Sequence, residues 1–106
     1  MTLVELFSFL NKNTPHCFYE NETDLQNAII GQHANSLMGE MIKMIAEKCS
    51  CQDIHCVIKR EDVVNALGPL RLEYMKDDAP VDGFRLLEGT ITAIDLAFNE
   101  EALKNK

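Results

Sequence analysis

The chain lacks the long hydrophobic runs that would carry it across a membrane. Its 106 residues are 46% hydrophobic and 25% charged, which is ordinary for a globular protein. No apolar stretch approaches the roughly 20 residues that a transmembrane helix needs. The opening MTLVELFSFL has no basic segment and includes Glu5, which argues against a secretory signal peptide. We therefore expect a single helical domain spanning residues 1–106 in an intracellular location, either cytoplasmic or nuclear.

Basic residues are scarce relative to acidic ones. The chain has 10 lysines and arginines against 17 aspartates and glutamates, which gives a net charge of −7. This balance argues against direct binding of nucleic acid by the chain alone. It fits either a basic partner or a simple requirement for solubility.

Motifs that carry catalysis are also missing. The sequence has no Ser/His/Asp or Cys/His arrangement in a recognisable context, no glycine-rich phosphate loop and no distinctive pair of carboxylates. We therefore predict a protein that is not an enzyme and that uses no cofactor.

The cysteines form the densest group of reactive side chains. Without a signal peptide, reduced thiols are expected. The stretch Cys49–Cys56 holds three thiols and His55, and zinc binds such ligands tetrahedrally. His16 or Cys17 could replace one ligand. The spacing contains no CxxC pair, however, so we expect no metal and favour cysteines packed as small hydrophobic side chains. A zinc site at Cys49, Cys51, His55 and Cys56 stays open, and a redox switch is a weaker alternative.

The stretch Thr23–Cys49 is predicted to form one long central helix. Thr23 and Gln26 fit a capping box, and proline is absent. Gly31 and Gly39 each weaken a helix by about 1 kcal/mol relative to alanine. Apolar residues recur at steps of three and four along it, as an amphipathic helix requires: Leu25, Ala28, Ile29, Ala34, Leu37, Met38, Met41, Ile42, Ile45 and Cys49.

Shorter elements are predicted before and after this helix. Thr2–Asn11 reads as a buried helix with a Thr2/Glu5 capping box, and His16–Tyr19 as an extended piece. Ile54–Ile58 is β-branched and apolar, which favours a second extended segment.

The C-terminal part is predicted to contain two more helices. The first covers Arg60–Leu67 and ends or restarts at Gly68-Pro69. After a loop over Met75–Val81, Asp82 caps a final amphipathic helix through Phe98, with fraying from Glu100 to Lys106. The predicted fold class is all-α, either an irregular helical bundle or an arrangement with a short, a long and a short helix plus a C-terminal helix.

This element order resembles that of the histone fold. The segment NTPHCFYEN (Asn13–Asn21) is similar to the first loop of transcription-factor histone folds, and VIKREDVVNAL (Val57–Leu67) is similar to their second loop and third helix. The resemblance covers about residues 2–75. It departs from the family in a longer span from Pro15 to Ile58 and in His55, which stands where members carry an arginine. The resemblance implies a non-nucleosomal subunit of a transcription-complex or kinetochore type.

Two functions follow from these patterns. In the first, a histone-fold-like interaction subunit forms a homodimer or heterodimer through the long helix within a larger regulatory or nucleic-acid-associated assembly. The alternative is a small acidic inhibitor or immunity-type protein, of phage or bacterial kind, that blocks a basic site on an enzyme or nucleic-acid-binding protein. For the first function, the predicted partner-binding residues are Leu37, Met38, Met41, Ile45, Val63 and Leu67.

Overall fold

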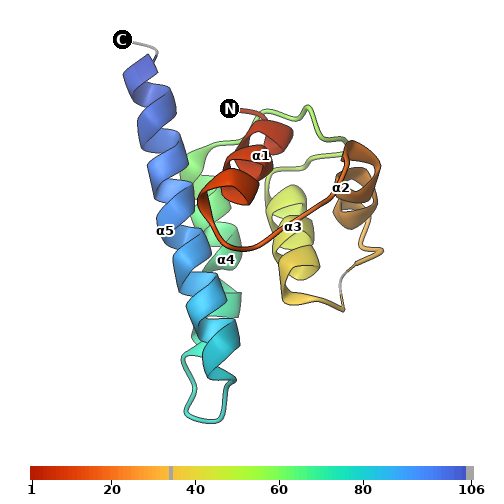
Figure 1. Cartoon of the computed structure of the whole chain (residues 1–106). Helices are drawn as coiled ribbons and strands as arrows, with labels where there is room; N and C mark the ends of the chain where they lie inside the picture. The colour runs from red at the N-terminus through yellow and green to blue at the C-terminus, as the bar shows by residue number, and fades with distance from the viewer. Residues whose placement is uncertain (34, 105–106) are drawn as a thin grey trace.

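The computed structural model describes residues 1–33 and 35–104, and these residues form five α-helices without a β-strand (Figure 1). The predicted all-α class is therefore confirmed. Ala34 and residues 105–106, which belong to the predicted stripe and to the predicted frayed end, lie outside the described residues. The helices are α1 (Leu3–Asn13), α2 (Glu22–Ile29), α3 (Leu37–Lys48), α4 (Arg60–Tyr74) and α5 (Val81–Lys104).

Helix α1 begins as the sequence predicts and runs two residues further. The Thr2 hydroxyl accepts a hydrogen bond from the Glu5 amide at 3.3 Å, and the Glu5 carboxylate accepts one from the Thr2 amide at 3.0 Å. This reciprocal pair satisfies amides that the first turn leaves without helical partners. The predicted capping box is confirmed.

The predicted long central helix is wrong, because the chain leaves the helix after Ile29 and starts a new one at Leu37. Gly31 adopts a positive φ of 91°, a conformation that glycine tolerates and that an α-helix cannot contain. Ser36 then caps α3 by accepting a hydrogen bond from the Gly39 amide at 3.0 Å. At the other end, Asn21 rather than Thr23 caps α2. The break allows α2 to fold back against α3.

The segment between α3 and α4 runs beside the N-terminus. Its Cys56 and Ile54 carbonyls accept hydrogen bonds from the Leu3 and Val4 amides, each at 2.9 Å. One isolated antiparallel bridge joins Thr2 to Val57. The predicted extended character of Ile54–Ile58 is thus present as a single bridge within the described chain, and it closes the first turn of α1 against the middle of the sequence.

Helices α4 and α5 form an antiparallel hairpin, which gives the molecule its long axis (Figure 1). Helix α4 does not stop at Pro69. Proline removes a helical hydrogen bond to the residue four positions earlier, and here that residue, Asn65, is exposed, so its carbonyl can reach water. Helix α5 starts at Val81, which places Asp82 inside the first turn, and continues past Phe98 to Lys104.

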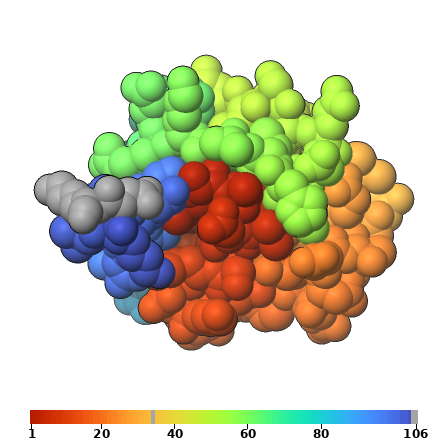
Figure 2. Space-filling model, turned by 90° about the horizontal axis from the view of Figure 1, so that it is seen from above, coloured from red at the N-terminus to blue at the C-terminus, as the bar shows by residue number. Residues whose placement is uncertain are grey.

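Helix α1 lies at the centre of one face, with segments of the other helices around it (Figure 2). Its Leu3, Leu6, Phe7 and Leu10 are fully buried, which agrees with a helix that is apolar nearly all round. No helix within the described residues is both long and apolar enough to span a bilayer.

Candidate interaction surface

The six predicted partner-binding residues divide into two groups. Met41, Ile45, Val63 and Leu67 have no exposed surface and pack inside the chain's own core. The break after Ile29 is the physical reason, because it lets α2 and α4 cover the stripe of α3 that a long helix would have left open. A partner surface at these four residues is therefore not available in the folded chain. Leu37 and Met38, in the first turn of α3, are only partly buried.

Met38 lies in a groove between the loop that precedes α2 and the start of α3. We call it the α2–α3 groove, and its cavity volume is about 370 Å³. None of the residues on its loop side was predicted from the sequence as a partner-binding residue, and Cys17 was considered only as a replacement metal ligand. The lining residues are Cys17, Phe18, Tyr19, Glu20, Asp24, Ala28, His33, Ser36, Met38 and Gly39.

The loop wall of the groove is held in place by Asn11 at the end of α1. Its amide side chain donates to the Tyr19 carbonyl at 3.0 Å, and its oxygen accepts from the Phe18 amide at 2.6 Å. Phe18 is buried and packs against Phe7 of α1, with ring centroids 5.6 Å apart. An aromatic pair at this separation contributes beyond its buried area. The loop wall is therefore anchored to the core.

The opposite wall is held by contacts between the α2–α3 connection and α3. The Ser36 hydroxyl donates to the His33 carbonyl at 3.0 Å while accepting from the Gly39 amide. The His33 carbonyl packs so closely on Gly39 that a Cβ there would overlap it. Glycine at position 39 thus permits the close approach of backbone to backbone, and both walls are fixed without a bound partner.

The charge around this groove is of one sign. Residues 13–42 contain no lysine or arginine and include Glu20, Glu22, Asp24 and Glu40. Within the described chain, none of these four carboxylates takes part in an ion pair, whereas the four ion pairs present there all lie elsewhere. Lys43, the next cation along α3, pairs with Glu47 at 3.7 Å. Glu20 and Asp24 line the groove directly.

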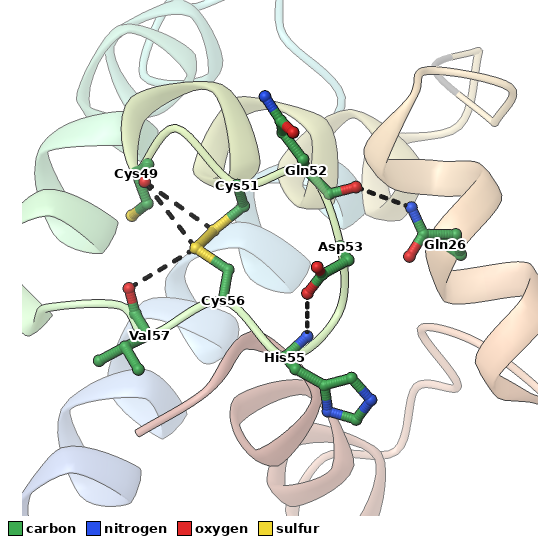
Figure 3. The surroundings of a disulfide bond; sticks show 8 residues. All are labelled: Gln26, Cys49, Cys51, Gln52, Asp53, His55, Cys56 and Val57. Atoms are coloured by element: carbon green, nitrogen blue, oxygen red, sulfur yellow. Dashed lines mark hydrogen bonds between the residues drawn. A yellow bond between two sulfur atoms is a disulfide. The ribbon is translucent and has the colours of Figure 1, made fainter.

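The cysteine-rich segment does not form a metal centre in the described chain. Cys51 and Cys56 form a disulfide, with Cα atoms 5.4 Å apart, so the expectation of four reduced thiols is wrong for this pair. The Cys49 carbonyl lies within 4.0 Å of both sulfurs, and Gln26 of α2 donates to the Gln52 carbonyl at 2.9 Å (Figure 3). Within residues 1–33 and 35–104, no group of three or more His, Cys, Asp or Glu side chains is placed to hold a metal ion.

The two remaining thiols differ in their surroundings. Cys17 is exposed at the α2–α3 groove, and Cys49 is partly buried. Burial, reinforced by the carboxylate of Asp62, raises the pKa of the Cys49 thiol. Because the thiolate is the reactive form, Cys49 is a poor nucleophile despite its proximity to the disulfide.

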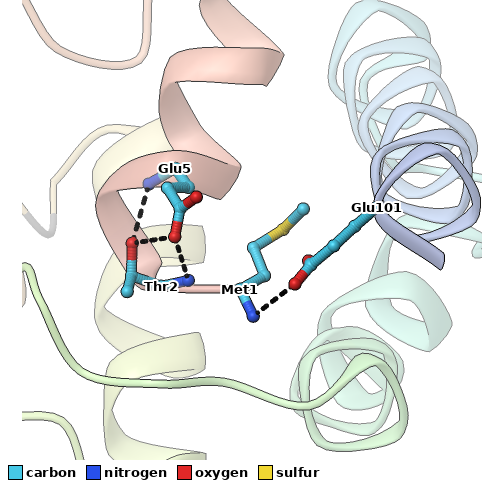
Figure 4. A network of polar contacts seen from close by, with 4 residues as sticks. All are labelled: Met1, Thr2, Glu5 and Glu101. Atoms are coloured by element: carbon cyan, nitrogen blue, oxygen red, sulfur yellow. Dashed lines mark hydrogen bonds and ion pairs between the residues drawn. The ribbon is translucent and has the colours of Figure 1, made fainter. Parts of the chain in front are cut away.

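A second polar cluster fixes the start of the chain against α5. The Met1 amino group pairs with the Glu101 carboxylate at 2.8 Å, next to the Thr2/Glu5 capping box (Figure 4). The backbone amide of Thr2, followed by its hydroxyl, lowers the pKa of Glu5 below its ordinary value of 4.5. Of these contacts, only the Met1–Glu101 pair reaches α5, and the second Glu101 oxygen is buried without a hydrogen-bond partner in the described chain.

A third feature is an apolar surface at the end of the α4–α5 hairpin. Leu72, Met75 and Val81 are 68%, 58% and 63% exposed. Met75 and Val81 line one shallow depression with Tyr74 and Phe84. We call these five residues the hairpin tip. Exposed apolar side chains that gather in this way mark interaction sites more often than single ones do.

Comparison of the chain with protein-family models, with curated proteins and with solved structures finds no match in any of the three.

Proposed function

We propose that this protein is a non-enzymatic interaction module that binds a basic partner protein. The observation that carries the proposal is the acidic segment Glu20–Asp24, whose three carboxylates have no ion-pair partner within the described chain. Two surface carboxylates elsewhere are paired within the chain, in Arg60–Asp95 at 2.7 Å and Arg71–Glu88 at 2.8 Å. Other carboxylates of the described chain, such as that of Asp77, are also unpaired, and the acidic segment differs from them in lying beside the α2–α3 groove. A segment of uncompensated charge beside a preformed groove favours a partner of opposite charge.

The electrostatics of the whole chain support the same proposal. A net charge of −7 attracts basic proteins over roughly a Debye length, about 8 Å at physiological ionic strength, and raises association rates. It repels nucleic acid, whose phosphates carry the same sign. Of the functions considered from the sequence, an acidic protein that covers a basic site fits this surface best.

Affinity capture with matched baits tests the proposal. The wild-type chain and two triple variants are used as baits in extract from the native host, with bound proteins identified by mass spectrometry. Glu20→Gln/Glu22→Gln/Asp24→Asn neutralises the acidic segment, and Glu73→Gln/Asp77→Asn/Asp78→Asn makes the same charge change near the hairpin tip. We expect a basic protein that is retained by the wild type and the second variant and is lost with the first.

Two results would contradict the proposal. One is a wild-type bait that enriches no protein over an empty resin. The other is a partner that both triple variants retain equally, because its binding would then be independent of the acidic segment. Circular dichroism must show that both variants fold, since Glu22 and Asp24 also stabilise the first turn of α2.

The hairpin tip favours a second candidate function, namely assembly with another copy of the chain or a related one. Its three exposed apolar side chains are placed where a symmetric contact could bury them. This candidate is still the interaction subunit predicted from the sequence. Its contact surface is the hairpin tip instead of the buried residues of α3 and α4. Sedimentation of the purified chain tests assembly with another copy, because a monomer at high concentration excludes self-association. The capture experiment tests assembly with a related chain, and Leu72→Glu in the hairpin tip should abolish that assembly.

A further inference from the structure

The α2–α3 groove offers two kinds of contact to a partner. Its apolar contact surface comes from Tyr19 and Met38, which are only partly buried, because Phe18 and Ala28 are 7% and 2% exposed and offer a ligand little area. We call Tyr19 and Met38 the apolar floor. Its rim carries the carboxylates of Glu20 and Asp24. A ligand that used both would need an apolar group and a cation close together.

We infer that this groove binds a short basic segment of the partner, with an aliphatic side chain on the apolar floor and a neighbouring arginine or lysine on the acidic rim. The inference rests on the proposed function and names the part of the partner that is recognised. Arginine suits the rim because its planar guanidinium pairs with carboxylates through two parallel hydrogen bonds. Methionine suits the floor because its unbranched side chain adapts to different aliphatic groups.

Two further features of the groove support this occupant. Within the described chain, no cation pairs with Glu20 or Asp24, and residues 13–42 contain no lysine or arginine. The walls are also fixed in advance, by Asn11 on the loop side and by the packing of His33 on Gly39 on the other. A preformed groove loses less conformational entropy when it binds a ligand.

The acidic residues are not explained by helix stability alone. Asp24 lies in the first turn of α2, where it stabilises the helix in any case. Glu20 precedes the cap residue Asn21 and lies outside the helix, yet it lines the groove together with Asp24.

Fluorescence anisotropy with three labelled hexapeptides tests the inference. The first alternates arginine and leucine, the second arginine and serine, and the third glutamate and leucine. We expect the wild-type protein to bind only the first with measurable affinity. Glu20→Gln/Asp24→Asn should weaken that binding by about tenfold or more, as loss of a charge-assisted pair implies, and Met38→Ala should weaken it by severalfold. The control Asp77→Asn/Asp78→Asn, which removes the same charge, should leave it within about twofold.

A footprint at Cys17 locates the bound peptide. Iodoacetamide alkylates a thiolate by displacing iodide, and Cys17 is the exposed thiol that lines the groove. At an Arg-Leu peptide concentration near the wild-type Kd, alkylation of Cys17 should slow in the wild type and should slow much less in Glu20→Gln/Asp24→Asn. Melting curves establish that each variant is folded.

Each other outcome overturns the inference. If the arginine–serine peptide binds as tightly as the arginine–leucine peptide, the apolar floor has no role in binding. If the control variant weakens binding as much as Glu20→Gln/Asp24→Asn does, the effect depends only on the overall charge of the protein. If the peptide does not bind, or if it binds and Cys17 stays fully reactive, the groove is not the binding site of a basic segment. If the capture experiment still finds a basic partner that depends on the acidic segment, the proposed function survives while the groove assignment fails.

Discussion

At the scale of single residues, two helical glycines of this chain have opposite surroundings. A Cβ at Gly39 would overlap the His33 carbonyl, whereas a Cβ at Gly89 of α5 would meet no atom within 4 Å. Gly39 therefore admits the backbone of the α2–α3 connection onto α3. Gly89 serves no comparable contact and only adds conformational freedom to the unfolded chain.

We expect alanine substitutions at these two positions to change stability in opposite directions. Gly39→Ala should lower the free energy of unfolding by about 1–3 kcal/mol, because backbone atoms must shift to admit the methyl group. Gly89→Ala should raise it by about 0.5–1 kcal/mol, since alanine is the better helix former. Urea unfolding followed by circular dichroism measures both. A stabilising Gly39→Ala would show that the His33 carbonyl does not pack on α3.

The disulfide between Cys51 and Cys56 predicts a definite number of reactive thiols. Protein purified in air and alkylated in denaturant should take up two labels, at Cys17 and Cys49, and four after reduction. Peptide mass spectrometry identifies the positions. Reduction should also lower stability by roughly 2 kcal/mol, the loop-closure entropy of a short loop, and Cys51→Ser/Cys56→Ser should not respond to reductant. Four labels without reduction would contradict the bond.

At the scale of elements, local sequence patterns predicted which stretches are helical better than they predicted where each helix begins and ends. The Thr2/Glu5 box predicted the start of α1 because capping depends on residues three apart. The helical period of residues 23–49 is interrupted only by the step of five from Ile29 to Ala34. Gly31 and the Ser36 cap divide the stretch at that place. The gain from breaking the helix is tertiary, since it folds α2 onto α3, and no local pattern records that gain.

The same distinction explains what was predicted of the groove. Met38 was predicted because it lies on an apolar stripe. Glu20 and Asp24 were missed because they become part of a groove only when α3, a separate segment, packs beside them. One signal was present in the sequence, namely the absence of any lysine or arginine from residues 13–42.

The cap of α1 makes stability depend on pH in a predictable direction. Hydrogen bonds from Thr2 lower the pKa of Glu5 in the folded chain, so the unfolded chain takes up this proton at a higher pH. The stabilisation is therefore present above a pH of about 4.5 and is lost as the pH falls through the lowered pKa. We expect Glu5→Gln to lose less thermal stability than the wild type between about pH 6 and pH 3.

Melting curves across this range check the cap prediction. Glu73→Gln is the control, since Glu73 is exposed and its carboxylate accepts no hydrogen bond within the described chain. If acidification lowers the melting temperatures of the wild type, Glu5→Gln and Glu73→Gln by the same amount, Glu5 has no special role in the loss of stability at low pH.

At the scale of the whole molecule, the chain's own helices cover the apolar stripe of α3, which the sequence analysis predicted to bind a partner. The buried set draws on all five helices of the described residues, including Leu25 of α2 and Ile94 of α5. Assembly therefore does not have to supply the core. Any partner must bind what remains outside, either the acidic groove or the hairpin tip, and substitutions can separate these surfaces from the core.

Met41→Glu and Leu72→Glu introduce the same charge at opposite extremes of burial. Met41 has no exposed surface and Leu72 is 68% exposed. We expect Met41→Glu to destabilise the monomer by about 3–5 kcal/mol, the penalty for a buried charge without a partner, and Leu72→Glu to change stability by no more than about 0.5 kcal/mol. Urea unfolding measures both differences, and sedimentation gives the mass of each folded species. If the hairpin tip joins two copies, Leu72→Glu should sediment as a monomer where the wild type does not. If Met41→Glu instead stays as stable as the wild type and only its mass falls, Met41 faces another chain, and the closed core described for this fold does not exist in solution.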